Sequence, residues 1–186
     1  HHPPTCRQGG EAAGHAVDCS LERTCFLVQT QWSALEHIQQ QAKIRHIGVS
    51  NYCPSCDECL LRTAKVAPTV AQLMVNLGGV TPVATLTAWS QRHAMRIMAY
   101  SPINGLGLSA EQRDQVARIG AEHGNRSFVQ VALRWLTQRG ITPIVSSRNI
   151  DHLRQNLDIF PWRLSAAAMS RLDVMRGSFS KKGPSQ

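Results

Sequence analysis

Apolar residues follow two spacings along the chain, one typical of helices and one typical of buried strands. From Gln31 onward apolar side chains recur every three or four residues, which predicts a helix, whereas residues 3 to about 27 show little periodicity and predict a loop. Short apolar runs rich in β-branched residues predict four buried strands. These strands cover residues 44–49, 69–75, 96–100 and 141–145.

Helices are predicted between and after these strands. Pro54 suits the first turn of a helix, and Pro68 ends that helix. Ser109 and Gln112 have the spacing of a capping box, and Ser127 is predicted to cap the next helix. The other predicted helices cover residues 82–93, 109 to about 124, 127–139, 150 to about 157 and 165 to about 175.

This alternation predicts an α/β protein with a parallel sheet, because crossover helices cover both faces of such a sheet. Polar or small residues follow the strands, at Ser50-Asn51, Ser101-Pro102 and 146–148. In (β/α)8 TIM barrels the functional site is built from these carboxyl ends of the strands. A closed barrel typically has about 250 residues, so the pattern predicts a partial barrel.

Composition favours an ordinary globular chain. The 186 residues are 42% hydrophobic and 17% charged, and no apolar run approaches the ~20 residues that span a bilayer. The net charge is +8, but the basic residues are dispersed apart from Lys181-Lys182, so a solvated surface is expected rather than a nucleic-acid partner. The start at His1-His2, without Met or signal-peptide pattern, predicts a piece of a longer, cytoplasmic protein.

Six cysteines raise the question of disulfides or a metal. Disulfide frameworks are typical of short secreted chains, so reduced thiols in a cytosol-like compartment are expected. Cys53, Cys56 and Cys59 form a C-x-x-C-x-x-C run that could bind a metal or do redox work. No fourth ligand lies nearby in the sequence, and Cys25 is far upstream, so surface or half-buried thiols and no metal site are predicted.

Four ordered motifs resemble the aldo-keto reductase family, and together they cover nearly everything from Gln31 to Met175. They are Trp32-Ser33-Ala34-Leu35-Glu36, the run Gly48-Val49-Ser50-Asn51-Tyr52, Ala99-Tyr100-Ser101-Pro102, and Val129-Gln130-Val131-Ala132-Leu133-Arg134-Trp135-Leu136. The resemblance implies roughly strands 5–8 of the barrel, in a domain of residues 1–176 followed by a flexible tail of residues 177–186. It also implies hydride transfer from NADP(H) to a small-molecule aldehyde or ketone.

The resemblance places His1 at the family's catalytic histidine, because His1-His2-Pro3 matches its H-x-P motif. A neutral imidazole there would donate a hydrogen bond to the substrate carbonyl. A chance or tag-derived histidine pair is the alternative. The family's acid, a tyrosine tuned by a lysine and an aspartate, matches no part of this chain. The resemblance therefore implies an N-terminal half-barrel as partner and an inactive isolated chain, and a non-catalytic dinucleotide-binding regulator of the same fold is the alternative function.

The resemblance also assigns residues to the cofactor. Ser50, Asn51 and Gln72 fall where the family holds the nicotinamide carboxamide, and Tyr100 where an aromatic ring stacks on the nicotinamide. Taken singly, each of these is more often a turn, a cap, a polar strand end or a core residue.

The remaining assigned residues belong to the phosphate and adenosine ends of the cofactor. Ser101, Ile103 and Gly105 occupy the pyrophosphate position, and the adenosine end corresponds to Ser147, Arg148, His152, Gln155 and Asn156. Arg148 would suit a ribose 2′-phosphate, which favours NADP over NAD, although a solvated loop cation is the alternative.

Overall fold

The computed structural model describes residues 19–52, 54–79, 81–103 and 108–175, and the chain divides into two compact units. Unit 1 comprises residues 1–73 and 85–98, and unit 2 comprises residues 74–84 and 99–186. The predicted tail of residues 177–186 lies outside the described residues, and the domain boundary at residue 176 stays a prediction.

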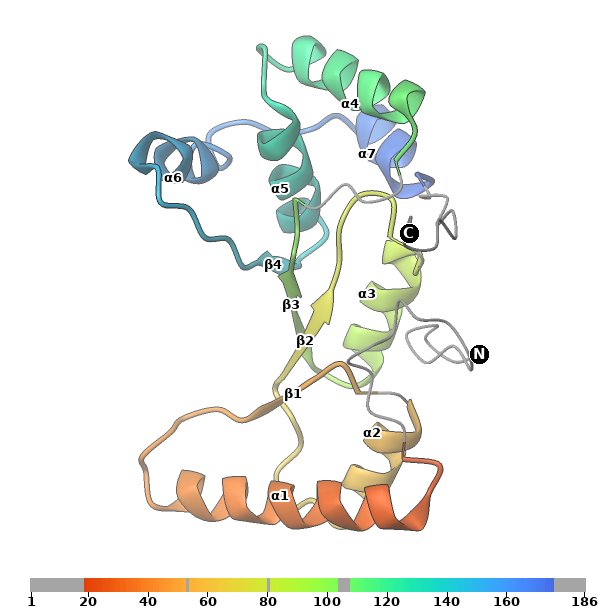
Figure 1. Ribbon diagram of the computed structural model, residues 1–186, viewed down its shortest axis with the longest axis vertical. Helices are drawn as coiled ribbons and strands as arrows, with labels where there is room; N and C mark the ends of the chain where they lie inside the picture. Colours follow the sequence, from red (N-terminus) through yellow and green to blue (C-terminus); the bar gives the residue numbers. More distant parts are fainter. Residues whose placement is uncertain (1–18, 53, 80, 104–107, 176–186) are drawn as a thin grey trace, which may run out of the picture. The chain divides into compact units, whose positions relative to one another are not determined.

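Within the described ranges, helices alternate with four strands, as the sequence pattern predicts (Figure 1). The strands are hydrogen-bonded in the order β1-β2-β3-β4, and β1 pairs with β2 in parallel. The α/β class with a parallel sheet is therefore confirmed. The elements are α1 (Glu22–Gln40), β1 (Gly48–Ser50), α2 (Pro54–Leu61), β2 (Val70–Met74), α3 (Val83–Arg92), β3 (Arg96–Tyr100), α4 (Ala110–Glu122), α5 (Phe128–Gln138), β4 (Thr142–Pro143), α6 (Ile150–Leu157) and α7 (Ala166–Asp173).

Several predicted helix starts are confirmed by their side-chain caps. The Ser109 hydroxyl accepts a hydrogen bond from the Gln112 backbone N–H at 3.2 Å, and the Gln112 side chain accepts one from the Ser109 N–H in return. Ser127 and Gln130 form the same capping box at the start of α5. These boxes satisfy backbone donors that the helix itself leaves without partners.

Three predicted boundaries are wrong. The predicted loop up to residue 27 is helical from Glu22, because Cys25, Val28 and Trp32 form a buried stripe along α1. The first strand begins only at Gly48 rather than at residue 44, and β4 has two residues instead of five. Pairing decides these lengths, since the carbonyl of Ile47 is the first in that segment to accept a β2-side bond, from the Thr69 N–H at 3.0 Å.

In unit 1, α1 is fastened to the segment that follows α2. The indole of the buried Trp32 donates to the Val66 carbonyl at 3.0 Å. The carboxylate of Glu36, which is also buried, accepts from the backbone N–H groups of Lys65 at 2.7 Å and Val66 at 2.8 Å. A buried carboxylate is tolerated here because backbone donors satisfy it.

Two disulfides add to this fastening and overturn the expectation of reduced thiols. Cys19 is bonded to Cys56, and Cys25 on α1 is bonded to Cys59 on α2. All four side chains are buried, so the predicted surface or half-buried position is also wrong for Cys56 and Cys59. The i, i+3 spacing turns this pair of α2 toward the α1 side, and bonding removes their thiolates as metal ligands. Cys53, the third member of the run, lies outside the described residues.

In unit 2, α5 forms the core. Its residues Val131, Leu133 and Leu136 are fully buried, and α5 packs against α4, α6 and β4. The Trp135 indole donates to Asp173 at 2.8 Å, and Arg139 pairs with the same carboxylate, which joins α5 to α7. The last helix is therefore held by polar contacts as well as by its apolar face.

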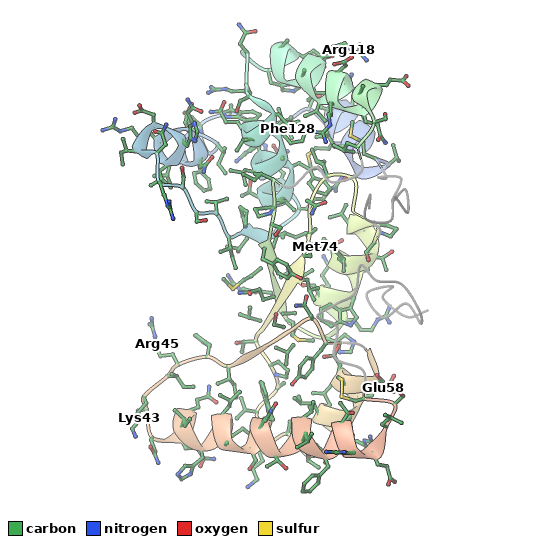
Figure 2. The ribbon with its side chains drawn as sticks, viewed as in Figure 1. Lys43, Arg45, Glu58, Met74, Arg118 and Phe128 are labelled. Carbon is green, nitrogen blue, oxygen red and sulfur yellow. A yellow bond between two sulfur atoms is a disulfide. The ribbon has the colours of Figure 1, made fainter. Side chains whose placement is uncertain are left out.

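Exposed cations lie on the surface of both units. Lys43 and Arg45 are exposed in the loop after α1, and Arg118 is exposed on α4 (Figure 2). None of the described helices is both long enough and apolar enough to cross a bilayer.

Candidate functional site

Three of the predicted site residues come together at the carboxyl end of β1 in unit 1. Ser50 is the register partner of Gln72 in the parallel pair, and its hydroxyl donates to the Gln72 backbone carbonyl at 3.2 Å. The Asn51 backbone N–H donates to the same carbonyl at 3.1 Å. Gln72 lies in the middle of β2 and not at its end as predicted, but its register partner Ser50 is the last residue of β1. Ser50 is exposed and the other two are half-buried, so a ligand can reach this edge.

Close approach of the two strands sets this geometry. A Cβ added to Gly48 would lie 2.5 Å from the Val70 carbonyl oxygen, so only glycine lets β1 pair this tightly at its first residue. Asn51 then leaves the strand with a φ of +53°, a left-handed conformation that Asn tolerates better than most residues. The chain is thereby turned sharply at the residue predicted to meet the carboxamide.

Two ionisable groups lie just after this strand end. Burial raises the pKa of Tyr52 above its ordinary 10.0, and the Asp57 carboxylate raises it further. The pKa of Asp57 is raised to about 7, mainly by burial and to a smaller extent by repulsion from the Glu58 carboxylate. Asp57 is 3% exposed, and neither of its carboxylate oxygens has a hydrogen-bond partner in the part of the chain that the structure describes. Because its pKa is raised, the Tyr52 hydroxyl is a weaker acid than an ordinary tyrosine and a poor proton donor at neutral pH.

In unit 2, the predicted residues Tyr100 and Ser101 end and follow β3. Tyr100 is half-buried, and Ser101 has a φ of +50°. Ile103, two residues further on, is exposed. The sequence did not single out Asn76, whose buried side chain donates to the Ser101 carbonyl at 3.3 Å. The available signal was a polar residue directly after a predicted strand.

The adenosine-end residues lie before and along α6, with Ser147 and Arg148 ahead of the helix and His152, Gln155 and Asn156 within it. The Ser147 hydroxyl accepts from the Asn149 N–H at 3.0 Å, and the Asn149 side chain caps α6 by accepting from the Asp151 N–H at 2.8 Å. Arg148 is exposed, with no ion pair within the described ranges. No residue of α6 is buried; of its predicted members, His152 and Gln155 are exposed and Asn156 is half-buried. A cation beside a helix start is suited to an anionic group.

Two predicted residues have no structural test. His1 and Gly105 lie outside the described residues, so their roles stay predictions.

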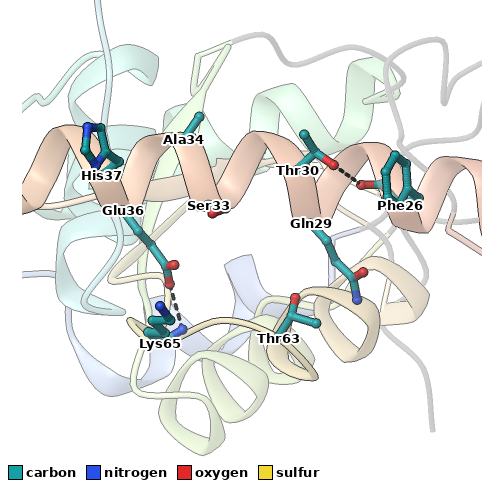
Figure 3. A pocket seen from close by; sticks show the side chains of 9 residues that line it. All are labelled: Phe26, Gln29, Thr30, Ser33, Ala34, Glu36, His37, Thr63 and Lys65. Atoms are coloured by element: carbon teal, nitrogen blue, oxygen red, sulfur yellow. Dashed lines mark hydrogen bonds between the residues drawn. The ribbon is translucent and has the colours of Figure 1, made fainter.

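A separate open groove of about 680 Å³ lies in unit 1 along α1 (Figure 3). Its walls include Phe26, Thr30, Ser33 and His37 of α1 with Thr63 and Lys65 from the segment after α2. It contains none of the predicted site residues, and its Glu36 carboxylate is already engaged by backbone donors.

Comparison with known proteins settles the family. The aldo/keto reductase family model matches residues 13–176. The chain therefore belongs to the aldo/keto reductase family. It is 34% identical over 161 residues to an NAD(P)H-dependent D-xylose reductase of Aspergillus niger, covering 78% of this chain and 50% of the relative. It is 32% identical over 165 residues to a (1S)-1,7-diacetoxy-luvungin A aldo-keto reductase of Citrus sinensis, covering 82% of this chain and 51% of that one.

Solved structures agree with this assignment. A thermostable aldo-keto reductase, Tm1743, crystallised with epalrestat, has a TM-score of 0.72 and 26% identity, over 78% of this chain and 54% of that one. An aldo-keto reductase complexed with NADPH has a TM-score of 0.69 and 26% identity, over 82% of this chain and 49% of that one. The chain thus has part of the family's barrel fold. It spans about half the length of the curated relatives that it matches.

Proposed function

We propose that this chain is the carboxyl-terminal part of an NADP(H)-dependent reductase that converts an aldehyde or ketone to an alcohol. Support comes from family membership, from a relative named as NAD(P)H-dependent, and from similar structures with NADPH or NADP bound. The dinucleotide, when bound, supplies the hydride.

The observation that carries the proposal is the cluster of Ser50, Asn51 and Gln72. An amide side chain both donates and accepts hydrogen bonds, as the nicotinamide carboxamide does, and a hydroxyl can do the same. The Asn51 backbone N–H and the Ser50 hydroxyl both donate to the Gln72 carbonyl, so the backbone that carries these three residues is held in place before any ligand arrives. We propose that these three residues orient the carboxamide and that the Tyr100 ring stacks on the nicotinamide.

Unit 2 supplies the residues for the anionic end of the cofactor. Ser101, Ile103 and Gly105 are proposed to contact the pyrophosphate. Arg148 is proposed to bind the 2′-phosphate, because a planar guanidinium matches phosphate oxygens in two places at once. Its exposure beside the capped start of α6 supports this role. Ser147, His152, Gln155 and Asn156 are proposed to complete the adenosine end.

Proton chemistry is divided between this chain and a partner. We propose that His1 donates a hydrogen bond to the substrate carbonyl and that an N-terminal half-barrel provides the acid for the developing alkoxide. Tyr52 is unsuited to that task because burial raises its pKa. General acid catalysis typically contributes about 10²–10⁴-fold, so we expect no turnover by the isolated chain.

The cytoplasmic location stays a prediction, and the two disulfides do not favour it. Disulfides persist in oxidising compartments and are rare in the cytosol. Cys19–Cys56 and Cys25–Cys59 favour a protein that matures where thiols oxidise.

NADPH oxidation with a reactive aldehyde tests the proposal, measured for the complete reductase and for the 186-residue chain alone. We expect turnover only by the complete protein. Turnover by the purified chain would show that the acid lies within it. A complete protein that binds NADPH without turnover would instead be the non-catalytic regulator, and one that does not bind NADPH would contradict the cofactor assignment.

A further inference from the structure

Ser101, which directly follows β3, has a backbone conformation that its side chain disfavours. Its φ of +50° lies in the left-handed region, where a Cβ crowds the backbone. Pro102 comes next, and a residue before proline favours extended conformations instead. The backbone preferences of Ser101 and Pro102 therefore do not stabilise this turn. A contact from another part of unit 2 is needed to stabilise it.

The side chain of Asn76 makes that contact. Asn76 lies in the loop after β2, is 8% exposed, and donates from Nδ2 to the Ser101 carbonyl at 3.3 Å. Losing this bond would leave a buried amide donor without a partner, which is unfavourable. The bond therefore stabilises the position of the Ser101 peptide group.

Asn76 is itself held in a closed turn. The Gly79 N–H donates to the Asn76 carbonyl at 3.2 Å, and a Cβ on Gly79 would lie 3.1 Å from that oxygen. Gly78, between them, has a φ of +84°, which glycine adopts without steric cost. The turn thus fixes the main chain from which the Asn76 amide reaches Ser101.

We infer that Asn76 is a positioning residue for the dinucleotide, because it holds the left-handed turn from which Ser101 contacts the pyrophosphate. Asn76 need not touch the ligand. A turn already in its binding conformation loses less entropy when the ligand binds, which strengthens binding. This inference rests on the proposed function, since the contact of Ser101 with pyrophosphate is part of that proposal.

The test is a double-mutant cycle in the complete reductase. Asn76→Ala should raise the Kd and the KM for NADPH about three- to tenfold, the size of one neutral hydrogen bond, with kcat nearly unchanged. In a Ser101→Gly background the same substitution should cost little, because glycine adopts a positive φ without support. Asn76→Leu, which keeps about the same size but has no donor at any pH, is measured alongside so that the result does not depend on one variant folding.

Ala94→Gly is the matched control. Ala94 has a φ of +51° at the end of α3, so this change should stabilise the protein as Ser101→Gly does. It should leave the NADPH loss caused by Asn76→Ala unchanged. Equal losses in the wild-type and Ser101→Gly backgrounds, or rescue by Ala94→Gly, would overturn the inference. Unchanged NADPH affinity in both Asn76 variants would overturn it too, while a wild-type protein without NADPH affinity would overturn the proposed function with it.

Discussion

The backbone N–H of Asn51 donates to the backbone carbonyl of Gln72 at 3.1 Å, and this main-chain bond sets the spacing of the two residues. The parallel register of Ser50 with Gln72 fixes the same spacing one residue earlier. Truncating either amide side chain should therefore leave the sheet pairing intact. Substitutions in this cluster can therefore change cofactor affinity without changing the stability of the fold.

Arg148 should discriminate between the two dinucleotides. We predict that Arg148→Ala weakens NADPH binding by about 1.5–3 kcal/mol, the size of a hydrogen bond between charged groups, and leaves NADH binding nearly unchanged. Only NADPH carries the 2′-phosphate. Arg118→Ala, at an exposed arginine of α4 (Figure 2), should alter neither affinity. Equal losses for NADPH and NADH would assign Arg148 to structure.

The disulfides should dominate the stability of unit 1. Cys19–Cys56 and Cys25–Cys59 close loops with sequence separations of 37 and 34 residues, and each such bond typically contributes about 2–4 kcal/mol. We predict that a phosphine reductant lowers the midpoint of chemical unfolding, and that this effect shrinks in a Cys25→Ala/Cys59→Ala variant. Thiol titration of the denatured, unreduced chain gives the complementary measurement. A full complement of free thiols would contradict the bonded arrangement.

Asp57 should make the chain less stable as pH rises. Its folded pKa of about 7 lies above the ordinary 3.8. The contribution of neutral Asp57 to the free energy of unfolding is therefore fully present below pH 3.8 and is lost as pH rises through about 7. Asp57→Asn should abolish this decline and raise the free energy of unfolding near pH 8 by up to about 4 kcal/mol.

Unfolding measured across this pH range tests the role of Asp57. Tyr52 and Glu58 are the titratable groups that interact with it. Glu58→Gln, at the exposed neighbour, serves as control and should reduce the decline only slightly. Parallel curves for the wild type and Asp57→Asn would refute the assignment.

Much of the fold could be predicted because the relevant signals are local. The Ser127–Gln130 capping box and the apolar face of α5 lie within a few residues of each other, and the predicted helix appears where expected. In α1 the local signal misleads, since Phe26 is 67% exposed and obscures the stripe that contains Cys25 and Val28. Strand ends shifted because hydrogen-bonded partners, and not β-branched residues, set their lengths.

The sequence likewise predicts some features of the candidate site and not others. Asn51 and Gln72 are predicted from the family resemblance, Asn51 within a quoted motif and Gln72 by its position on the next strand, and the structure brings them together with Ser50. Asn76 was missed because its partner, the Ser101 carbonyl, lies 25 residues further along the chain. The disulfides were missed for the same reason, since spacing within the C-x-x-C-x-x-C run carries no information about distant cysteines.

Titration of NADPH by fluorescence quenching, with Asn51→Gly and Gln72→Ala in the complete reductase, tests the central claim most directly. Glycine removes the Asn51 amide but still permits the φ of +53°, so folding is preserved. Each variant should lose about 0.5–1.5 kcal/mol of binding free energy, one hydrogen bond to the carboxamide, at unchanged thermal stability. NADPH affinity equal to wild type in both variants would contradict the placement of the nicotinamide at β1 and β2.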